Sequence, residues 1–151
     1  MSSNEQAYPQ LPPLTEEGLL SLYQQTIFAR LGTINEDGTV HISPIYFKYK
    51  DRQIVMASQV RSRKIRNIKR NNKVSVLIDV TEPVYKGALI YGEAELDYEN
   101  VITKRAEIFM RFMSREESQE DAEGLCNRWE SVIVRLTPSS IASFDYSQDW
   151  P

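Results

Sequence analysis

Cysteine and histidine are almost absent from this chain of 151 residues, which contains one of each. The single cysteine, Cys126, cannot form an internal disulfide, and no Cys/His cluster offers a metal site. No apolar run approaches the ~20 residues that span a bilayer. The first residues, MSSNEQAYPQLPPLTEE, lack the charged and apolar regions of a secretory signal. We therefore expect a cytoplasmic protein that has no membrane segment and is held together by its hydrophobic core.

Acidic residues are missing from one long stretch of the chain. Residues 52–78 contain eight Lys or Arg and no Asp or Glu. Because the net charge of the whole chain is −3, the residues outside this stretch together carry −11. Seven of these basic residues lie in RSRKIRNIKRNNK at 61–73. A nucleic-acid-binding protein usually spreads its basic surface over a face or a whole domain, and the acidic remainder would repel a long polyanion. The pattern favours a compact anion over nucleic acid, and a solvated helix face without a ligand is the alternative.

The spacing of apolar residues predicts a mainly β fold. Asp37-Gly38 separates two runs of β-type residues and is typical of a hairpin turn. Pro44 cannot donate a sheet hydrogen bond, so its strand should bulge there or lie at an edge. SVIVRLTP and SIASFDY indicate two closing strands joined around Pro138. Further strands are indicated over residues 53–58, 73–80 and 86–98. Six or seven such strands with short hairpins predict a small antiparallel barrel with peripheral helices.

Helical signals are confined to short segments around these strands. Thr15 is placed as the N-cap of a first helix, and the apolar period over 100–113 predicts an amphipathic helix. Ser114 with Glu117 forms a capping-box signature for a second, acidic helix. Residues 1–14 are polar and contain three prolines. We therefore expect a flexible N-terminal arm over 1–14 and a single domain over 15–151.

The basic stretch begins as a helix directly after a strand, with isoleucines spaced for a buried stripe. The first turn of such a helix presents free N–H groups and a partial positive charge, where phosphate binds readily. Ser58 at the end of the strand and Ser62 at the start of the helix each offer a hydroxyl. Arg63 adds a bidentate fork and Lys64 a point charge. Together these four residues would suit one phosphomonoester.

The chain resembles the pyridoxamine 5′-phosphate oxidase-like family of flavin-binding split barrels in the order of three segments. These are FARLGTINEDGTVHISPIYFKYKDRQIVMAS, SRKIRNIKRNNKVSVLI and YGEAEL, within about residues 20–98. The most specific element is SRK at 62–64, where it opens a helix. The resemblance implies a six-stranded antiparallel split barrel of Greek-key-like order. It also implies a homodimer with two flavin mononucleotide (FMN) sites at its interface.

The resemblance further implies which residues contact the cofactor. Arg63 and Lys64 are expected to hold the FMN phosphate, with Ser58 contributing. Lys86 and Gly87 fall where the family brings partner-subunit groups to the flavin. The residues expected along the ribityl chain and ring are Ser43, Pro44, Ile45 and Tyr46, with the backbone of Met56 and Ala57.

Two departures from the family pattern narrow the implied activity. The oxidase itself has an arginine in its second strand where this chain has Ser43. It also ends with an arginine and a histidine that grip pyridoxal phosphate, whereas the tail SSIASFDYSQDWP contains neither. We therefore expect flavin binding without pyridoxamine phosphate oxidation.

The resulting hypothesis is an FMN-dependent oxidoreductase that acts on a small molecule. One alternative is a deazaflavin cofactor, whose longer tail would need an open basic groove. Another is a non-catalytic protein that stores or senses FMN. His41, the only histidine, is better explained as a strand residue than as a general base. Tyr146 and Trp150 are candidates for stacking on the flavin ring, with a frayed tail as the equal alternative.

Overall fold

The computed structural model describes residues 3–147 of the chain, and Trp150 lies outside them. Seven strands and four helices occur in this part. The strands are β1 (Ser3–Gln6), β2 (Phe28–Ile34), β3 (Val40–Lys50), β4 (Gln53–Gln59), β5 (Lys73–Val80), β6 (Lys86–Asp97) and β7 (Ser131–Asp145). The helices are α1 (Glu16–Gln25), α2 (Arg63–Arg70), α3 (Val101–Phe109) and α4 (Arg115–Arg128).

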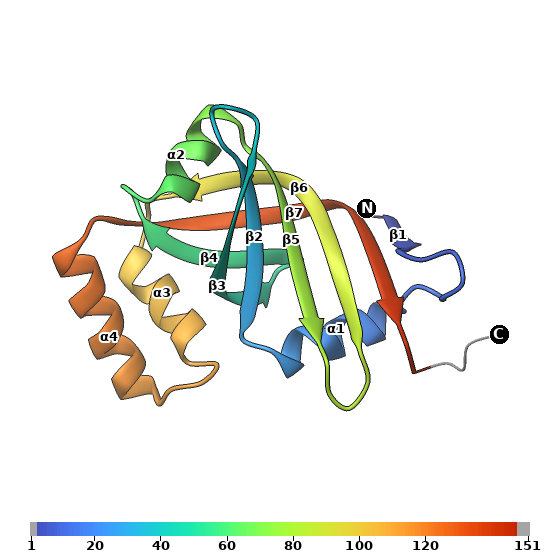
Figure 1. Cartoon of the computed structure of the whole chain (residues 1–151). Coiled ribbons are helices and arrows are strands. Elements are labelled where there is room, and N and C mark those ends of the chain that lie inside the picture. The colour runs from blue at the N-terminus through green and yellow to red at the C-terminus, as the bar shows by residue number, and fades with distance from the viewer. Residues whose placement is uncertain (1–2, 148–151) are drawn as a thin grey trace.

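Six of the strands close into an antiparallel barrel. The order is β7-β4-β3-β2-β5-β6, and a further pairing between β6 and β7 completes the ring. Helix α2 lies at one end of the barrel, and α3 and α4 lie beside it (Figure 1). The predicted six-stranded split barrel with peripheral helices is confirmed.

The hairpin predicted at Asp37-Gly38 joins β2 to β3 in the register Ile34 to Val40. Gly38 has a φ of 88°, a left-handed conformation that glycine adopts without steric cost. The Asp37 carboxylate accepts hydrogen bonds from the backbone N–H of Thr39 (3.0 Å) and from its hydroxyl (2.6 Å). Local turn chemistry thus fixes the register of the first hairpin.

Strand β3 changes its partner strand along its length. Its first half, through Tyr46, pairs with β2, while pairing with β4 begins at Phe47. Pro44 lies in the half that pairs with β2, where the other side of the strand has no partner strand, as expected of a residue without an N–H. Val40 and Ile42 in this half are 60% and 66% exposed. The split in the barrel therefore leaves an apolar strand edge at the surface.

The barrel interior is filled by alternate side chains of all six strands. Phe47, Met56, Ile78 and Ile90 are completely buried, and α2 closes one end with Ile65. Burial of such side chains stabilises the fold by roughly 1.5–3 kcal/mol each.

The helix caps follow the sequence signals. Thr15 Oγ1 accepts a hydrogen bond from Gly18 N (3.0 Å), and Ser114 Oγ accepts one from Glu117 N (3.1 Å). Helix α3 ends at Phe109, earlier than the expected Met113, because the chain turns there. Helices α3 and α4 pack together through a second apolar cluster of Ala106, Phe109 and Ala122.

Two segments differ from their expected form. The arm expected to be flexible over 1–14 is packed against the barrel where the structure describes it. Strand β1 pairs in parallel with β7, and Leu11 and Leu14 are buried. Because both leucines are buried, and Leu14 belongs to the main hydrophobic core, the entropy lost when the arm is ordered is compensated. The two closing strands expected around Pro138 are one continuous strand, β7, with a register shift opposite Tyr91 and Gly92.

No helix within residues 3–147 is both long and apolar enough to cross a membrane.

Candidate functional site

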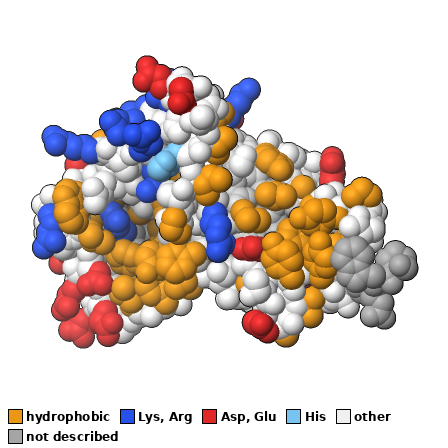
Figure 2. All heavy atoms as spheres, viewed as in Figure 1, with side chains coloured by type: hydrophobic (Ala, Val, Ile, Leu, Met, Phe, Trp, Pro, Cys, Tyr) orange, Lys and Arg blue, Asp and Glu red, His pale blue; other side chains and the backbone are white. Residues whose placement is uncertain are grey.

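A pocket of about 360 Å³ lies where the start of α2 meets β3, β4 and α3. Its volume falls in the range of small-molecule and cofactor sites. Basic side chains gather around α2, and an apolar area lies below them (Figure 2). The lining residues are Phe28, Pro44, Ile45, Tyr46, Ala57, Ser58, Gln59, Ser62, Lys64, Arg105, Ile108 and Phe109.

One end of the pocket is built from the join between β4 and α2. Ser58, the buried residue near the end of β4, places its Oγ 3.0 Å from Ser62 Oγ. Ser62 is the N-cap of α2, but its side chain makes no capping hydrogen bond to the first turn. The first turn contains no acidic residue. The N–H groups of this turn are therefore left for another acceptor.

Lys64 brings a full positive charge to this end of the pocket. Its side chain is half-buried and forms no ion pair within the described residues. Burial lowers the pKa of Lys64, and the nearby positive charge of Arg105 lowers it further. The free protein therefore holds a desolvated cation that a bound anion would stabilise.

Aromatic rings form the other end of the pocket. The rings of Phe28 and Tyr46 stack at 4.4 Å, and Tyr46 stacks on Phe112 at 4.5 Å. Phe109 meets Tyr46 edge-on at 6.0 Å. Such a wall suits a flat heterocycle, so the pocket joins an anion-binding end to an aromatic end.

Sequence reasoning missed the lining residues Phe28, Gln59, Ile108 and Phe109, and it also missed a charged one, Arg105 on α3. Its neighbours at helical spacing are Ile102 and Phe109, both on the apolar side of α3. An arginine within an apolar helix stripe is the signal that could have identified it, because such a position places the guanidinium against the protein interior.

The structure brings most of the expected site residues to this pocket. Pro44, Ile45 and Tyr46 of β3 line it, as do Ala57, Ser58, Ser62 and Lys64. Lys86 and Gly87 do not, because they lie at the β5–β6 turn, at the opposite end of the barrel from α2 (Figure 1).

Three other expected residues stand beside the pocket rather than in its lining. Met56 is fully buried with its side chain in the core, which leaves its backbone for the role implied by the resemblance. Arg63 is exposed, and its charge lowers the pKa of Asp37 after the larger effect of the hydrogen bonds from Thr39. Ser43 Oγ is buried and has no hydrogen-bond partner in residues 3–147.

The remaining basic residues of the segment divide into structural and exposed groups. Arg70 donates to Ile34 O (2.7 Å) and to Asn67 Oδ1 (2.9 Å). The buried Asn67 amide in turn donates to Thr33 Oγ1 (3.0 Å), which fixes α2 to β2. Arg66 and Lys69 are exposed. The solvated-face interpretation therefore describes part of the segment, while Lys64 belongs to the pocket.

The titratable residues of the lining are Tyr46, Lys64 and Arg105. The lining contains no carboxylate, histidine or cysteine, and His41 is outside it. No group of His, Cys, Asp or Glu that could hold a metal occurs among the described residues. The cations, hydroxyls and rings of the pocket can bind and orient a ligand, and its lining offers no carboxylate or imidazole for acid–base work.

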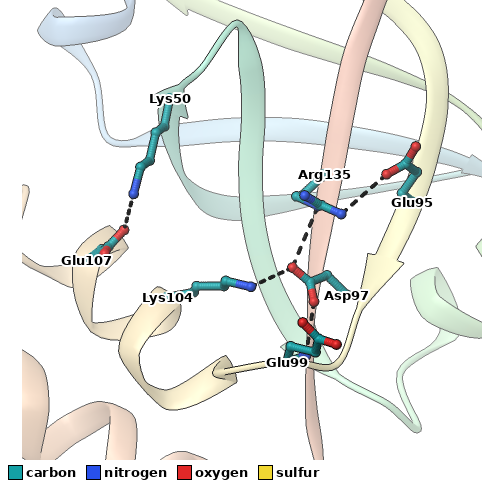
Figure 3. A network of polar contacts seen from close by, with 7 residues as sticks. All are labelled: Lys50, Glu95, Asp97, Glu99, Lys104, Glu107 and Arg135. Carbon is teal, nitrogen blue, oxygen red and sulfur yellow. Dashed lines mark hydrogen bonds and ion pairs between the residues drawn. The ribbon is translucent and has the colours of Figure 1, made fainter.

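A second charged cluster lies between α3 and the strands β3, β6 and β7 (Figure 3). Asp97 accepts from Lys104 Nζ (2.7 Å) and lies 3.7 Å from Arg135 Nε. Arg135 also reaches Glu95 (3.4 Å), and Lys50 reaches Glu107 (3.1 Å). Each cation drawn there has an anionic partner.

Solved structures share this fold at low sequence identity. A conserved hypothetical protein of Mycobacterium tuberculosis superposes with a TM-score of 0.81 at 21% identity, covering 95% of this chain and 91% of its own. The haem storage protein HutZ of Vibrio cholerae has a TM-score of 0.69 at 19% identity, covering 87% of this chain and 95% of its own. An FAD-binding protein of Mesorhizobium loti has a TM-score of 0.63 at 19% identity, covering 89% of this chain and 96% of its own. At these identities the likeness concerns the fold alone.

No curated protein sequence matches the chain. A family model described as pyridoxamine 5′-phosphate oxidase matches residues 15–126. This match covers most of the chain and includes the pocket together with α2 and α3. The chain therefore belongs to the pyridoxamine 5′-phosphate oxidase-like family.

Proposed function

We propose that this protein is an FMN-dependent oxidoreductase. The observation that carries the proposal is the pocket's two ends: hydroxyls and cations around the start of α2, and a wall of aromatic rings. A ligand that joins a phosphomonoester to a flat heterocycle satisfies both ends, and a flavin nucleotide is such a ligand. Family membership and the FAD-binding protein of the same fold give further support.

The residues present fit this cofactor. Ser58 and Ser62 would donate hydroxyl hydrogen bonds to the phosphate, and Lys64 would neutralise part of its charge. Arg63 would act from the rim, since its side chain is exposed at the same helix start. The ribityl chain and ring would lie along Pro44, Ile45 and Tyr46 and the backbone of residues 56–57, with Ser43 beside them.

Bound FMN would supply hydride or single-electron transfer, chemistry that the pocket's own side chains do not offer. This chain's residues would bind the cofactor, orient its ring against Tyr46 and keep water from its buried face. The substrate is a small molecule that would approach the open side of the ring.

A homodimer belongs to the same proposal. Lys86 and Gly87 are distant from the pocket within one chain, so in the arrangement implied by the family they would come from a second copy. The exposed apolar edge of β3, with Val40 and Ile42, offers a surface that a second copy could cover.

The first test is an absorption spectrum of the purified protein, repeated after adding FMN and removing the excess. We expect flavin absorption to stay with the protein and its molar mass to be that of two chains. Protein that retains no flavin after reconstitution contradicts the proposal. Deazaflavin and haem, added in the same way, then decide between the other ligands; haem is included because a haem storage protein has the same fold.

The alternative from a different class is a non-catalytic FMN carrier or sensor. It is favoured by the lining, which includes no carboxylate or imidazole for acid–base work. The oxidoreductase and the carrier are distinguished by mixing the FMN-loaded protein anaerobically with nicotinamide donors and then with electron acceptors. Reduction and reoxidation of the bound flavin support the oxidoreductase, whereas a flavin that no donor reduces supports the carrier.

A further inference from the structure

Arg105 has a guanidinium in the pocket and no carboxylate to neutralise it. Its Nη1 donates to Ser131 Oγ (2.8 Å), and the thiol of Cys126 lies beside it. Its Nε is buried and has no hydrogen-bond partner in the described part of the chain. No ion pair to Arg105 occurs there either. A guanidinium has five N–H donors, and the hydrogen bonds to Ser131 and Cys126 leave the others for a ligand.

The guanidinium is nevertheless held in place. Ser131 Oγ donates its own hydrogen to Trp129 O (3.0 Å), which leaves its lone pairs for Arg105. On another side, Arg105 Cζ lies 5.9 Å from the centre of the Phe109 ring. The side chain is therefore oriented before any ligand arrives, a condition that lowers the cost of binding.

Arg111, further along the same segment, shows the contrasting case of a guanidinium used in the fold. It packs over the ring of Phe47 at 4.7 Å. Its N–H groups donate to three backbone carbonyls, those of Phe47, Tyr23 and Thr26. Arg111 thus ties α3 to the barrel, while Arg105 faces a pocket with donors to spare.

The two pocket cations also oppose each other. Burial lowers the pKa of Arg105, and the positive charge of Arg105 contributes to the lowered pKa of Lys64. Two cations with no anion between them are unfavourable in the free protein. An anion that contacts both would remove this cost, and a phosphomonoester carries about two negative charges near neutral pH.

We propose that Arg105 is a binding residue for the ligand's phosphate. Together with Lys64 it forms a clamp between α2 and α3, in which the fork of Arg105 takes two phosphate oxygens and Lys64 takes a third. The identity of the ligand as FMN rests on the proposed function, whereas the clamp requires only a phosphomonoester. Because the clamp joins two elements that are far apart in sequence, phosphate binding also fixes α3 and its partner α4 to the barrel.

The test compares Arg105→Met with Arg66→Met, a matched loss of one exposed arginine of α2 that does not line the pocket. Each variant is titrated with FMN and with riboflavin, which has the same ring and no phosphate. We expect Arg105→Met to weaken FMN about tenfold to a hundredfold and to leave riboflavin unchanged. Arg66→Met should change FMN affinity less than about threefold, within the range of an exposed charge pair. FMN should also slow hydrogen exchange over residues 101–128 in the wild type but not in Arg105→Met.

Each other outcome overturns the clamp. If Arg105→Met binds FMN as tightly as the wild type does, Arg105 does not bind the phosphate. Equal losses for FMN and riboflavin make its role structural. If Arg105→Met does not fold, Arg105→Lys replaces it; this variant keeps the charge without the fork, and unchanged FMN affinity counts against the clamp.

Failure of the proposed function is recognised separately, because wild-type protein would then bind neither flavin. The clamp is in that case judged with inorganic phosphate. We expect phosphate to raise the thermal midpoint of the wild type and not that of Arg105→Met, and equal shifts in the two proteins overturn it.

Discussion

Helix α3 has a charged cluster on each side, and the two clusters differ in whether their cations have partners. Toward β6 and β7, Lys104 and Arg135 converge on the Asp97 carboxylate (Figure 3). Toward α2, Lys64 and Arg105 face a pocket whose lining contains no carboxylate. A neutralised cluster contributes to the folded state alone, whereas an unneutralised one stores a cost that a ligand can remove. The comparison separates the charges that hold the barrel together from those that would bind.

The largest expected effect is on ligand affinity. Lys64→Ala should weaken FMN binding by about 1.5–3 kcal/mol, because it removes a charge-assisted bond to the phosphate. Lys104→Ala removes the same type of side chain from the other cluster and should leave the affinity unchanged. Both are measured by FMN titration of the purified variants. Equal affinities for the two variants would erase the distinction between the clusters.

The next effect is on stability, in the paired cluster. Asp97→Asn should lower the free energy of unfolding by about 1–3 kcal/mol, because it leaves the charges of Lys104 and Arg135 without their shared carboxylate. Urea unfolding of the ligand-free protein measures this. Glu99→Gln makes the same change of charge at an exposed neighbour and should be nearly neutral.

The pH dependence of Asp97→Asn gives a second reading of this effect. The hydrogen bond from Lys104 is the main cause that holds the pKa of Asp97 below its usual value. A carboxyl group with a lowered pKa in the folded state stabilises the protein above its unfolded pKa of ~3.9. That contribution is lost as the pH falls through the folded value. Wild type and variant should therefore differ at neutral pH and converge below about pH 4, and a constant difference across this range would show that the carboxylate charge is not the cause.

The smallest effect is expected at the exposed margin of the paired cluster. Lys50 is 49% exposed and Glu107 28% exposed in their ion pair. Solvent screens such a pair, so Lys50→Ala should cost about 0.2–1 kcal/mol of stability. The cost should shrink further in high salt, which unfolding at two ionic strengths would test. A salt-independent loss of more than about 2 kcal/mol would exceed what an exposed pair contributes.

The fold was largely readable from the chain because its signals are local. Asp37-Gly38 defines the first hairpin, and Ser114 with Glu117 caps α4. Alternating apolar residues predicted the strands, and the family resemblance predicted that they form a six-stranded barrel. The packing of the arm over 1–14 could not be read from its polar composition, because the burial of Leu11 and Leu14 depends on residues that are distant in sequence.

The site was readable only in part, because a pocket is assembled from segments that are distant in sequence. SRK at 62–64 correctly marked the start of α2, yet of its two cations only Lys64 lines the pocket. Consecutive helical residues point about 100° apart, so the orientation of α2 on the barrel decides which of Arg63 and Lys64 faces inward. Arg105 stands more than 40 residues later, and nothing in its local sequence connects it with α2.

The sequence by itself thus determined the strands, the helix that follows β4 and the concentration of positive charge there, since these depend on neighbouring residues and on side-chain periodicity. Only the tertiary structure decided which of those charges are paired and which face the pocket. Pairing depends on distances between atoms of different elements, and these are fixed when the barrel closes and α3 packs against it.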